Sequence, residues 1–471
     1  MRFGLEEDTL EAIGKVLETV QMVDQALVFG SRAKGNYRAD SDIDLALKGE
    51  HLTHADLLHL AVKLDDLHLP WKFDLINYHT IDDPAVVEHI DRVGSEMYSR
   101  RKIYSLEEIS AVQTGPFGSQ LHMSDYKTTG TPIITVEHLG ENEILHNNLP
   151  LVGDEDRQRL IKYTLKEGDI VFSRVGSVDR RAYVSNKEDG WMFSGRCLRV
   201  RAFKEKVNPK FLSFYFGQDS FKETIRSIAV GATMPSINTT ILNEIEVSIP
   251  PLPEQTAIAS VLSSLDDKID LLHRQNKTLE EMAEALFKQW FVVEADDDWE
   301  DGTLEDLARF YNGKTRPKEE GVIPVYGGNG ILGYTGKFNY EGKSIVIGRV
   351  GAYCGSLYFE SKKIWVSDNA LLVKGLNENH IHYLFYLLKT LDLNSMALGS
   401  SHPLLTQGLL KSIEIKIPPA EKIEKFESQV SKIHEKIMAI GIQINTLAQL
   451  RNTLLPKLMS GEVRVKLSEQ D

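Results

Sequence analysis

The sequence predicts an α+β multidomain protein: an N-terminal α/β domain, then two β-rich domains separated by two long antiparallel coiled-coil helices. Three observations lead to this fold class. The chain has 471 residues, enough for about three domains. Short sequence landmarks recur in the same order after the first hundred residues. Two stretches also carry apolar residues at a spacing of 3.5 residues. Apolar residues make up 42% and charged residues 26%, which is typical of a folded soluble protein.

The first domain is expected over residues 1–100. Helical patterns and patterns typical of β-strands alternate there, with helices near 5–20, 53–68 and 84–98 and strands at 26–30, 41–48 and 72–78. This domain holds most of the acidity, because ten basic and nineteen acidic residues fall in it and the whole chain has a net charge of -14. The total argues against nucleic-acid binding, but residues 174–201 contain seven basic residues and predict a local positive surface.

The next part of the chain is expected to be a tandem duplication. Three landmarks return in order: SLEEI at 105–109 as TLEDL at 303–307, IVFSRVG at 170–176 as IVIGRVG at 345–351, and EVSIPP at 246–251 as EIKIPP at 414–419. Chance rarely supplies all three. We therefore expect two β-rich domains, over 103–251 and 302–419, each followed by a long helix.

The two long helices are expected over 252–295 and 420–466. Apolar positions alternate steps of four and three residues along each helix, which keeps one narrow seam facing a partner helix. Asn276 and Arg451 interrupt these seams and would fix the register. Each seam is also compatible with the core face of a separate helical domain. Two matched seams in one chain favour mutual pairing.

Residues 29–45 of the first domain group side chains suited to phosphate and metal binding. Gly30 and Ser31 follow a strand and precede a helix, where backbone N–H groups hold phosphate. Asp42 and Asp44 are two apart in a strand and so share one face of the sheet. Asp74 lies in a later strand that we expect beside them. Three converging carboxylates repel one another unless a cation such as Mg²⁺ intervenes.

The pattern GSRAKG…SDIDL, with a later lone Asp in an apolar strand, resembles the minimal nucleotidyltransferase domains of the polymerase-beta superfamily. The resemblance implies Mg²⁺ and a nucleoside triphosphate as cofactors. It makes Asp42 and Asp44 metal ligands, and Asp74 the third carboxylate, which also assists the attacking hydroxyl. Gly30 and Ser31 would cradle the triphosphate. Arg32 is assigned to nucleotide binding, with an ordinary ion pair as the alternative.

The remainder of the chain is similar to the specificity subunits of Type I restriction–modification enzymes. The residues that carry the likeness are SLEEISAVQTGPFGSQL at 105–121, IPPLPEQTAIASVLSSLDDKIDLL at 249–272, VIPVYGGNGILGYTG at 322–336 and LLPKLMSGEVRV at 454–465. The resemblance implies two non-catalytic target-recognition domains that each read half of a bipartite double-stranded DNA target. The helices would set the spacing and dock two methyltransferase subunits that use S-adenosylmethionine. A restriction subunit would use ATP for translocation.

Candidate DNA-contacting residues are polar or basic side chains in loops of the two repeats. They are Ser119, Gln120, Arg174, Arg180, Arg181, Thr233 and Ser236 in the first repeat, and Lys314, Arg316, Asn329, Arg349, Ser400 and His402 in the second. Each is also compatible with a loop residue that satisfies its own turn. Arg174 and Arg349 recur at matching positions, which favours phosphate contact or a shared structural ion pair over base reading.

The leading hypothesis is therefore a DNA-specificity subunit with an N-terminal nucleotidyltransferase domain of regulatory or docking role. One alternative is an Mg²⁺-dependent nucleotidyltransferase whose repeat region presents the substrate. Another is a scaffold or antitoxin-like interaction protein. No apolar run reaches the length of a membrane span, and the N-terminus is acidic, so a cytoplasmic protein is expected. Cys197 and Cys354 are expected to be reduced packing residues.

Overall fold

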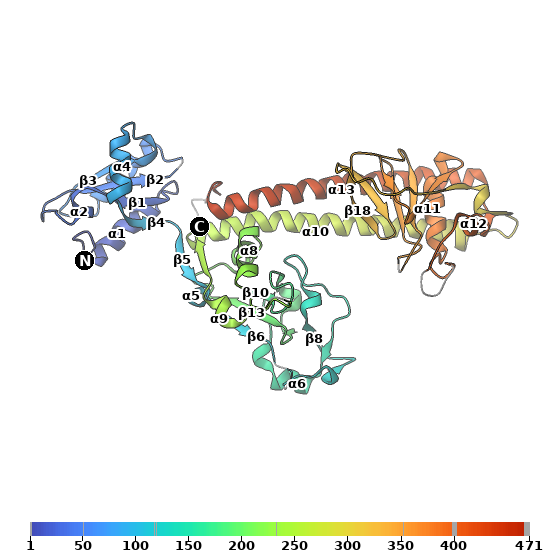
Figure 1. Cartoon of the computed structure of the whole chain (residues 1–471), viewed down its shortest axis with the longest axis horizontal. Helices are drawn as coiled ribbons and strands as arrows, with labels where there is room; N and C mark the ends of the chain where they lie inside the picture. Colours follow the sequence, from blue (N-terminus) through green and yellow to red (C-terminus); the bar gives the residue numbers. More distant parts are fainter. Residues whose placement is uncertain are drawn as a thin grey trace. The chain divides into compact units, whose positions relative to one another are not determined.

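The computed structural model describes residues 2–49, 51–116, 118, 120–231, 233–351, 353–397 and 403–465 (Figure 1). The candidates Ser119, Ser400 and His402 lie outside the described residues. The chain divides into two compact units. One contains residues 1–264 and 451–471, and the other contains residues 265–450.

The N-terminal domain is a four-stranded sheet of order β3-β2-β1-β4 with helices packed against it. Its strands are β1 (Gln25–Val28), β2 (Ile43–Lys48), β3 (Phe73–Asn77) and β4 (Ser95–Ser99), and its helices are α1 (Glu7–Glu18), α2 (Gly30–Lys34), α3 (His54–Asp65) and α4 (Pro84–Val93). Strands β2 and β3 are parallel, and the other neighbours are antiparallel. The helix α1 is amphipathic and buries Leu10, Ile13 and Leu17.

The prediction of a helix up to residue 98 is wrong at its end. The helix α4 stops at Val93, and residues 95–99 form the edge strand β4, which pairs with β1. The amide of Gly94 donates to the carbonyl of Ile90 and closes the helix. Inter-strand hydrogen bonds to β1 then override the local helical pattern, because an edge position on this sheet is available.

The first β-rich lobe contains two four-stranded sheets. The sheet of order β11-β10-β13-β6 packs toward the long helices, and the second sheet has the order β12-β8-β9-β7. The strands are β5 (Lys102–Ser105), β6 (Ser110–Thr114), β7 (Tyr126–Lys127), β8 (Thr131–Ile134), β9 (Leu151–Val152), β10 (Asp169–Ser173), β11 (Arg181–Tyr183), β12 (Met192–Phe193), β13 (Cys197–Ala202) and β14 (Glu246–Ile249). The helices are α5 (Leu106–Ile109), α6 (Asp154–Arg159), α7 (Pro209–Tyr215), α8 (Asp219–Ile228) and α9 (Thr239–Asn243).

The second lobe repeats the same plan with fewer elements. Its sheets have the orders β16-β22-β19-β20 and β18-β17-β21. The strands are β15 (Glu300–Thr303), β16 (Ala308–Asn312), β17 (Ile323–Gly327), β18 (Gly330–Thr335), β19 (Ser344–Gly348), β20 (Leu357–Glu360), β21 (Trp365–Val366), β22 (Ala370–Gly375) and β23 (Glu414–Ile417), and the helices are α11 (Ile381–Thr390) and α12 (Gln407–Lys411).

The sequence landmarks of the duplication occupy equivalent places in the two lobes. In the first lobe, β5 and β14 pair so that Ser105 lies opposite Glu246. In the second, β15 and β23 pair so that Thr303 lies opposite Glu414. Ser105 and Thr303 each begin a capping box. The first and third landmarks of each repeat are therefore strand partners, which confirms that the repeats share one fold.

The long helices are α10 (Leu252–Lys288, followed by a π-helical turn at Gln289–Val293) and α13 (Ala420–Ser460). Within the second unit, the side-chain nitrogen Nδ2 of Asn276 donates to the carbonyl oxygen of Ile437 at 3.3 Å, and the ring centroids of Phe287 and Phe426 are 5.8 Å apart. The residue number thus rises along α10 while it falls along α13, so the helices run antiparallel. Figure 1 shows them side by side.

The apolar seams behave as the 3.5-residue spacing predicts. The predicted seams run in steps of four and three residues from Ile258 to Trp290 and from Ile423 to Leu458. Every position of these seams, including Asn276 and Arg451, is buried or half-buried, and most residues between these positions are exposed. In the first unit, Leu454 and Leu458 of α13 join the same core cluster as Leu262 of α10. The fold class predicted from the sequence is therefore confirmed.

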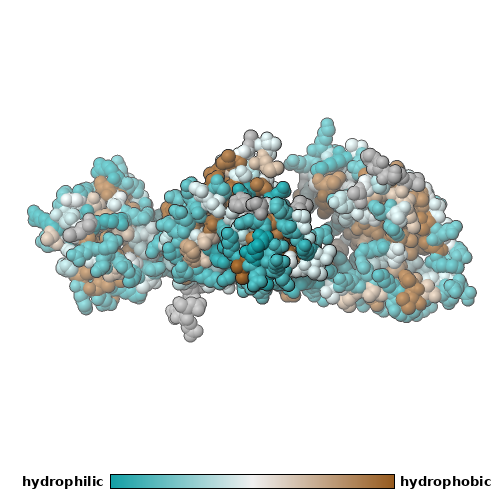
Figure 2. Space-filling view, turned by 90° about the horizontal axis from the view of Figure 1, so that it is seen from below, coloured by the Kyte–Doolittle hydropathy of each residue, from teal (hydrophilic) through white to brown (hydrophobic). Residues whose placement is uncertain are grey.

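The surface is mainly polar. Figure 2 shows hydrophilic side chains over most of the face in view, with apolar side chains in small separate groups. No helix in the described ranges has a segment that is both long enough and apolar enough to span a membrane.

Candidate functional sites

The predicted carboxylates lie at one end of the N-terminal sheet. Strands β2 and β3 are paired in parallel with Asp44 directly opposite Asp74, so their side chains share one face. Asp42 is two residues before Asp44. Partial burial, then the charges of Asp74 and Asp42, raise the pKa of the Asp44 carboxyl, and Arg32 acts in the opposite sense. The sheet thus brings together the three acidic residues that the sequence predicted.

Gly30 sits against this group at the start of α2. Its φ is +71°, a conformation that favours glycine, and a Cβ built on it would lie 2.2 Å from the Asp44 carboxylate oxygen. The amide of Phe29 also donates to the carbonyl of Asp44. Any residue other than glycine at position 30 would therefore displace Asp44. The backbone of Gly30 and Ser31 lies beside the carboxylates.

The prediction that Arg32 binds nucleotide is corrected by its surroundings. The residue is only 2% exposed, and its guanidinium donates to the backbone carbonyls of Phe3, Ser41 and Asp42 at 2.7–3.1 Å. The rings of Tyr37 and Trp71 flank it, with centroids 5.3 and 4.9 Å from Cζ. Because its donors are directed at backbone oxygens inside the domain, the side chain is not available to a phosphate group in solution.

The carboxylates do not form a closed metal site in the present side-chain positions. Within the described residues, no three His, Cys, Asp or Glu side chains are arranged to hold a metal ion. The chemistry of the donor set nevertheless fits a hard cation, because Asp44 carries an unfavourable interaction with both neighbouring carboxylates that a cation would relieve. The residues therefore fit Mg²⁺ by donor type and by proximity of Asp44 to its two neighbours.

In the two lobes, Arg174 and Arg349 occupy equivalent turns. Each is followed by a glycine with φ near +75°, Gly176 or Gly351, whose amide donates to a proline carbonyl in a later loop. The guanidinium of Arg174 lies 3.4 Å from Thr114 Oγ1, and that of Arg349 lies 3.2 Å from Asn312 Oδ1. The duplication therefore preserves this turn together with its polar partner.

Sequence reasoning missed Thr114 and Asn312, the partners of these arginines. Both end the first strand of their sheet, β6 or β16. Their positions differ by 198, the same offset that relates the SLEEI and TLEDL landmarks. Extending that alignment by five residues would have paired them.

The other predicted DNA residues that the structure describes differ in how exposed they are. Arg180, Thr233, Lys314, Arg316 and Asn329 are exposed, whereas Gln120, Arg174, Ser236 and Arg349 are half-buried. The strand-like bridge between Val175 and Ser236 brings Ser236 to the Arg174 turn. Asn329 occupies the two-residue turn of the β17–β18 hairpin. The Gln120 side chain instead accepts from the Tyr163 hydroxyl at 2.8 Å, so it is partly used inside the lobe.

Arg181 is not a surface residue, and its prediction as a DNA contact is corrected. It is 3% exposed, its Nε donates to the carbonyl of Ser213 at 2.9 Å, and Nη1 lies 3.2 Å from Glu141. The side chain fills the space between β11 and α7. Because Arg181 is buried and bonded to Ser213, its role is structural.

The positive surface predicted over 174–201 is also smaller than the seven basic residues of this stretch indicated. The Arg201 guanidinium forms two 2.7 Å bonds with the Asp169 carboxylate, which is 1% exposed, and the buried Arg199 lies 4.0 Å from the same group. Residues two apart in a strand point to the same face, so Arg199 and Arg201 of β13 both reach Asp169. Arg181 is held inside the lobe by Ser213 and Glu141. The exposed basic residues of the stretch are Arg180, Lys187 and Arg196.

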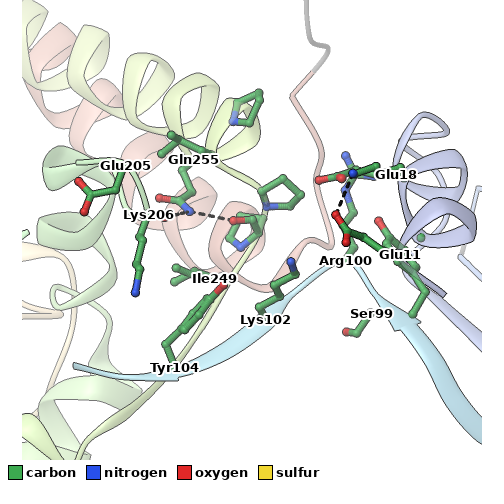
Figure 3. Close-up of a pocket in the computed structure, with 17 residues that line it drawn as sticks. Glu11, Glu18, Ser99, Arg100, Lys102, Tyr104, Glu205, Lys206, Ile249 and Gln255 are labelled. Atoms are coloured by element: carbon green, nitrogen blue, oxygen red, sulfur yellow. Dashed lines mark hydrogen bonds and ion pairs between the residues drawn. The ribbon is translucent and has the colours of Figure 1, made fainter. Parts of the chain in front are cut away.

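A cleft of about 510 Å³ lies between α1 of the N-terminal domain and the turn that connects β14 to α10. Figure 3 shows Lys102 and Tyr104 on its floor, with Glu11 and Glu18 on one side and Gln255 on the other. Nearby, Arg100 and Glu254 form a buried ion pair at 2.8 Å. The cleft contains none of the predicted site residues, and its lining mixes basic and acidic groups.

Two lobes of one fold and an antiparallel helical pair define a protein built by internal duplication, with an attached α/β domain. Comparison with known proteins identifies the family. The family described as "Type I restriction modification DNA specificity domain" matches residues 99–281 and 296–452, and "Polymerase beta, Nucleotidyltransferase" matches residues 11–103. The chain therefore belongs to the Type I restriction–modification DNA specificity family and carries a nucleotidyltransferase domain at its N-terminus. Both resemblances are confirmed.

Relatives and a solved structure agree with this assignment. The MjaIX specificity subunit of a Type I restriction enzyme from Methanocaldococcus jannaschii is 28% identical over 311 residues, covering 56% of this chain and 71% of that protein. The putative MjaX specificity subunit of the same organism is 24% identical and covers 72% and 88%. The crystal structure of a Type I S subunit from M. genitalium has a TM-score of 0.53 at 18% identity and covers 78% and 97%, a likeness of fold.

Proposed function

We propose that the two lobes each read one half of a bipartite double-stranded DNA sequence. The observation that carries this proposal is the repeated turn of Arg174 and Arg349, each anchored to the end of the same strand in its lobe. A pair of equivalent basic turns on like-folded lobes suits two equivalent phosphate contacts, while base contacts come from side chains that differ between the lobes, such as Thr233 and Asn329.

The test of DNA reading is selection from random DNA. Full-length chain, co-expressed with an adenine methyltransferase subunit, is used to capture random duplexes that are then sequenced. Two short conserved motifs at a fixed spacing are expected. Substituting Asn329 by Ala should relax one motif and leave the other unchanged. Capture without sequence preference would contradict the proposal and favour a scaffold.

In the same proposal, the helical pair sets the distance between the half-sites and docks two methyltransferase subunits. S-adenosylmethionine and ATP would be used by partner subunits, ATP by a restriction subunit. Outside the seam and the positions packed against the lobes, most residues of α10 and α13 are exposed, which leaves room for such partners. Co-purification and measurement of the mass of the complex test the stoichiometry, for which two methyltransferase subunits per chain are expected.

We propose a second activity for the N-terminal domain: transfer of a nucleotidyl group from a nucleoside triphosphate to a hydroxyl, with release of pyrophosphate. Asp42, Asp44 and Asp74 would hold Mg²⁺, and the backbone of Gly30 and Ser31 would hold the triphosphate. Mg²⁺ supplies charge neutralisation when bound. The chain itself orients the nucleotide and provides in Asp74 a base near the attacking hydroxyl.

Incubation of the full chain and its partner subunits with Mg²⁺ and radiolabelled nucleotides tests this activity. Label should appear on a protein or nucleic acid, and the Asp44→Asn variant should lose at least about 100-fold in rate. Absence of transfer from all four nucleotides, with Asp44→Asn indistinguishable from the unmodified chain, would contradict the activity and leave a docking role.

A further inference from the structure

We propose that Arg32 is a positioning residue of the carboxylate site: its guanidinium holds the turn at 41–42 so that Asp42 and Asp44 face one cation together. The inference rests on the proposed nucleotidyltransferase function. It assigns the arginine next to Gly30 and Ser31 to the support of metal binding, not to contact with the triphosphate.

The hydrogen bonds define what Arg32 holds. Nη2 lies 2.7 Å and Nε 3.0 Å from the carbonyl oxygen of Ser41, and Nε also lies 3.1 Å from that of Asp42. Nη1 lies 2.9 Å from the carbonyl oxygen of Phe3. The planar fork therefore ties the residues that lead into β2 to the N-terminal segment. Asp42 is held through its own backbone carbonyl, directly beside its side chain.

Aromatic rings hold the guanidinium in turn. Tyr37 and Trp71 lie on it, and the indole nitrogen of Trp71 donates to the carbonyl of Ala39 at 2.8 Å. Trp71 comes just before β3, the strand that carries Asp74. Arg32 and Trp71 thus connect the turn before Asp42 to the strand of the third carboxylate.

The opposite boundary of the site is fixed by Gly30, which lies against the carboxylate of Asp44. Asp44 is thereby placed between the start of α2 and the neighbouring Asp74. Asp42, which precedes β2, has no such strand partner. It is the carboxylate whose position depends most on the turn, so loss of Arg32 should reduce cation affinity through Asp42.

The test measures Mn²⁺ binding by the full chain, from the electron paramagnetic resonance signal of free Mn²⁺, with circular dichroism and melting as checks of folding. Arg32→Gln is expected to weaken binding by about tenfold or more, as for loss of other groups that orient metal ligands. Arg32→Lys should weaken it similarly, because a single ammonium cannot replace the fork to three carbonyls. Arg92→Gln, which removes an exposed arginine of α4, is the control and should bind as the unmodified chain does.

Binding of magnesium tripolyphosphate, measured by calorimetry, separates positioning from phosphate contact. Wild-type Mn²⁺ affinity in Arg32→Lys would overturn the proposal, because a positive charge alone would then suffice. Normal Mn²⁺ binding in Arg32→Gln with weakened tripolyphosphate binding would also overturn it, and would restore the phosphate-binding role. If the unmodified chain binds no Mn²⁺, the proposed nucleotidyltransferase function fails as well.

A second variant keeps the proposal testable if Arg32→Gln does not fold. Trp71→Leu removes the ring beside the guanidinium and the indole bond to Ala39, but leaves every candidate ligand in place. A two- to fivefold weaker affinity for Mn²⁺ is expected. Unchanged affinity in a variant that remains folded would count against positioning by this cluster.

Discussion

The two lobes share one sheet almost strand for strand and differ in the other. The sheets β11-β10-β13-β6 and β20-β19-β22-β16 have the same order and contribute Phe172 and Ile347, respectively, to cores shared with the long helices. The second sheet has four strands and its own core of buried residues in the first lobe, but three strands and a smaller core in the second. The part that meets the helices is thus retained, and the part farther from them has diverged.

This difference separates two physical demands. A sheet that packs against the long helices must fit the side chains of those helices. Substitutions at this contact therefore leave cavities or cause overlap. A sheet with its own small core can lose a strand and still bury its apolar residues. Side chains that read different half-sites are expected on the divergent part, while equivalent phosphate contacts are expected on the shared part, at Arg174 and Arg349.

The largest effect is expected from emptying the core of the shared sheet in one lobe. Phe172 is fully buried and its ring lies 5.1 Å from that of Phe216. Phe172→Ala should lower the free energy of unfolding by about 3–5 kcal/mol, whereas Ile347→Val, at the equivalent position, should cost about 0.5–1.5 kcal/mol. Denaturation by urea checks both values. Equal losses of unfolding free energy in the two variants would contradict the expectation that the cores of the two lobes are organised alike.

Acid should weaken the second lobe selectively. Burial, and then the charge of His382, lower the pKa of His434 to about 3, and the Tyr386 hydroxyl contacts its ring at 2.9 Å. In the unfolded chain, His434 binds a proton below about pH 6.5, whereas in the folded chain it does so only near pH 3. The contribution of neutral His434 to the free energy of unfolding is therefore fully present above pH 6.5 and is lost as the pH falls through this window.

Between pH 6.5 and 5, this loss amounts to about 2 kcal/mol. Calorimetric melting at both pH values measures it, and His434→Gln should flatten the dependence. His273→Gln, which replaces an exposed histidine of α10, is the control and should retain it. A first lobe that melts earlier than the second on acidification would be contrary to expectation.

Arg181 marks a position where the lobes differ in polarity. It lies opposite Phe172, and Leu357 takes the equivalent place opposite Ile347. Arg181→Leu should cost about 1–3 kcal/mol, because it leaves the carbonyl of Ser213 without this donor. It should leave affinity for DNA unchanged. Arg180→Leu, one residue earlier and exposed, should instead weaken DNA binding. Its effect on stability should be smaller than that of Arg181→Leu, because its hydrogen bond to the carbonyl of Leu139 is only partly buried. A reversal of these outcomes would return Arg181 to the DNA surface.

The smallest effect is expected from the matched arginines. Arg174→Gln and Arg349→Gln should each weaken DNA binding several-fold without altering the selected sequence, and each should reduce the slope of log affinity against log salt by about one, as expected for loss of one phosphate contact. Binding titrations at several salt concentrations check this. A change in preferred sequence from either variant would place that arginine at a base.

Much of the architecture follows from local patterns. Landmark order predicted the duplication, the 3.5-residue spacing predicted both long helices, and Gly30, Asp42, Asp44 and Asp74 were recognised from their spacing. The edge strand β4 was missed because its residues read as the end of a helix. Arg32 and Arg181 were misassigned because nothing in their immediate neighbours shows that Phe3 or Ser213, far away in the chain, supplies their partners.

The sequence by itself determined that this chain is a tandem repeat on paired helices with an acidic α/β domain in front, since periodicity and repetition depend on residues close together in the chain. Only the tertiary structure decided which arginines remain in contact with solvent. Arg180 and Arg201 are both arginines of the basic stretch 174–201, and the sequence does not distinguish them. Arg201 binds the buried Asp169, whereas Arg180 is exposed. The reason is that burial is set by neighbouring strands, β10 and β13, whose pairing joins residues about thirty positions apart.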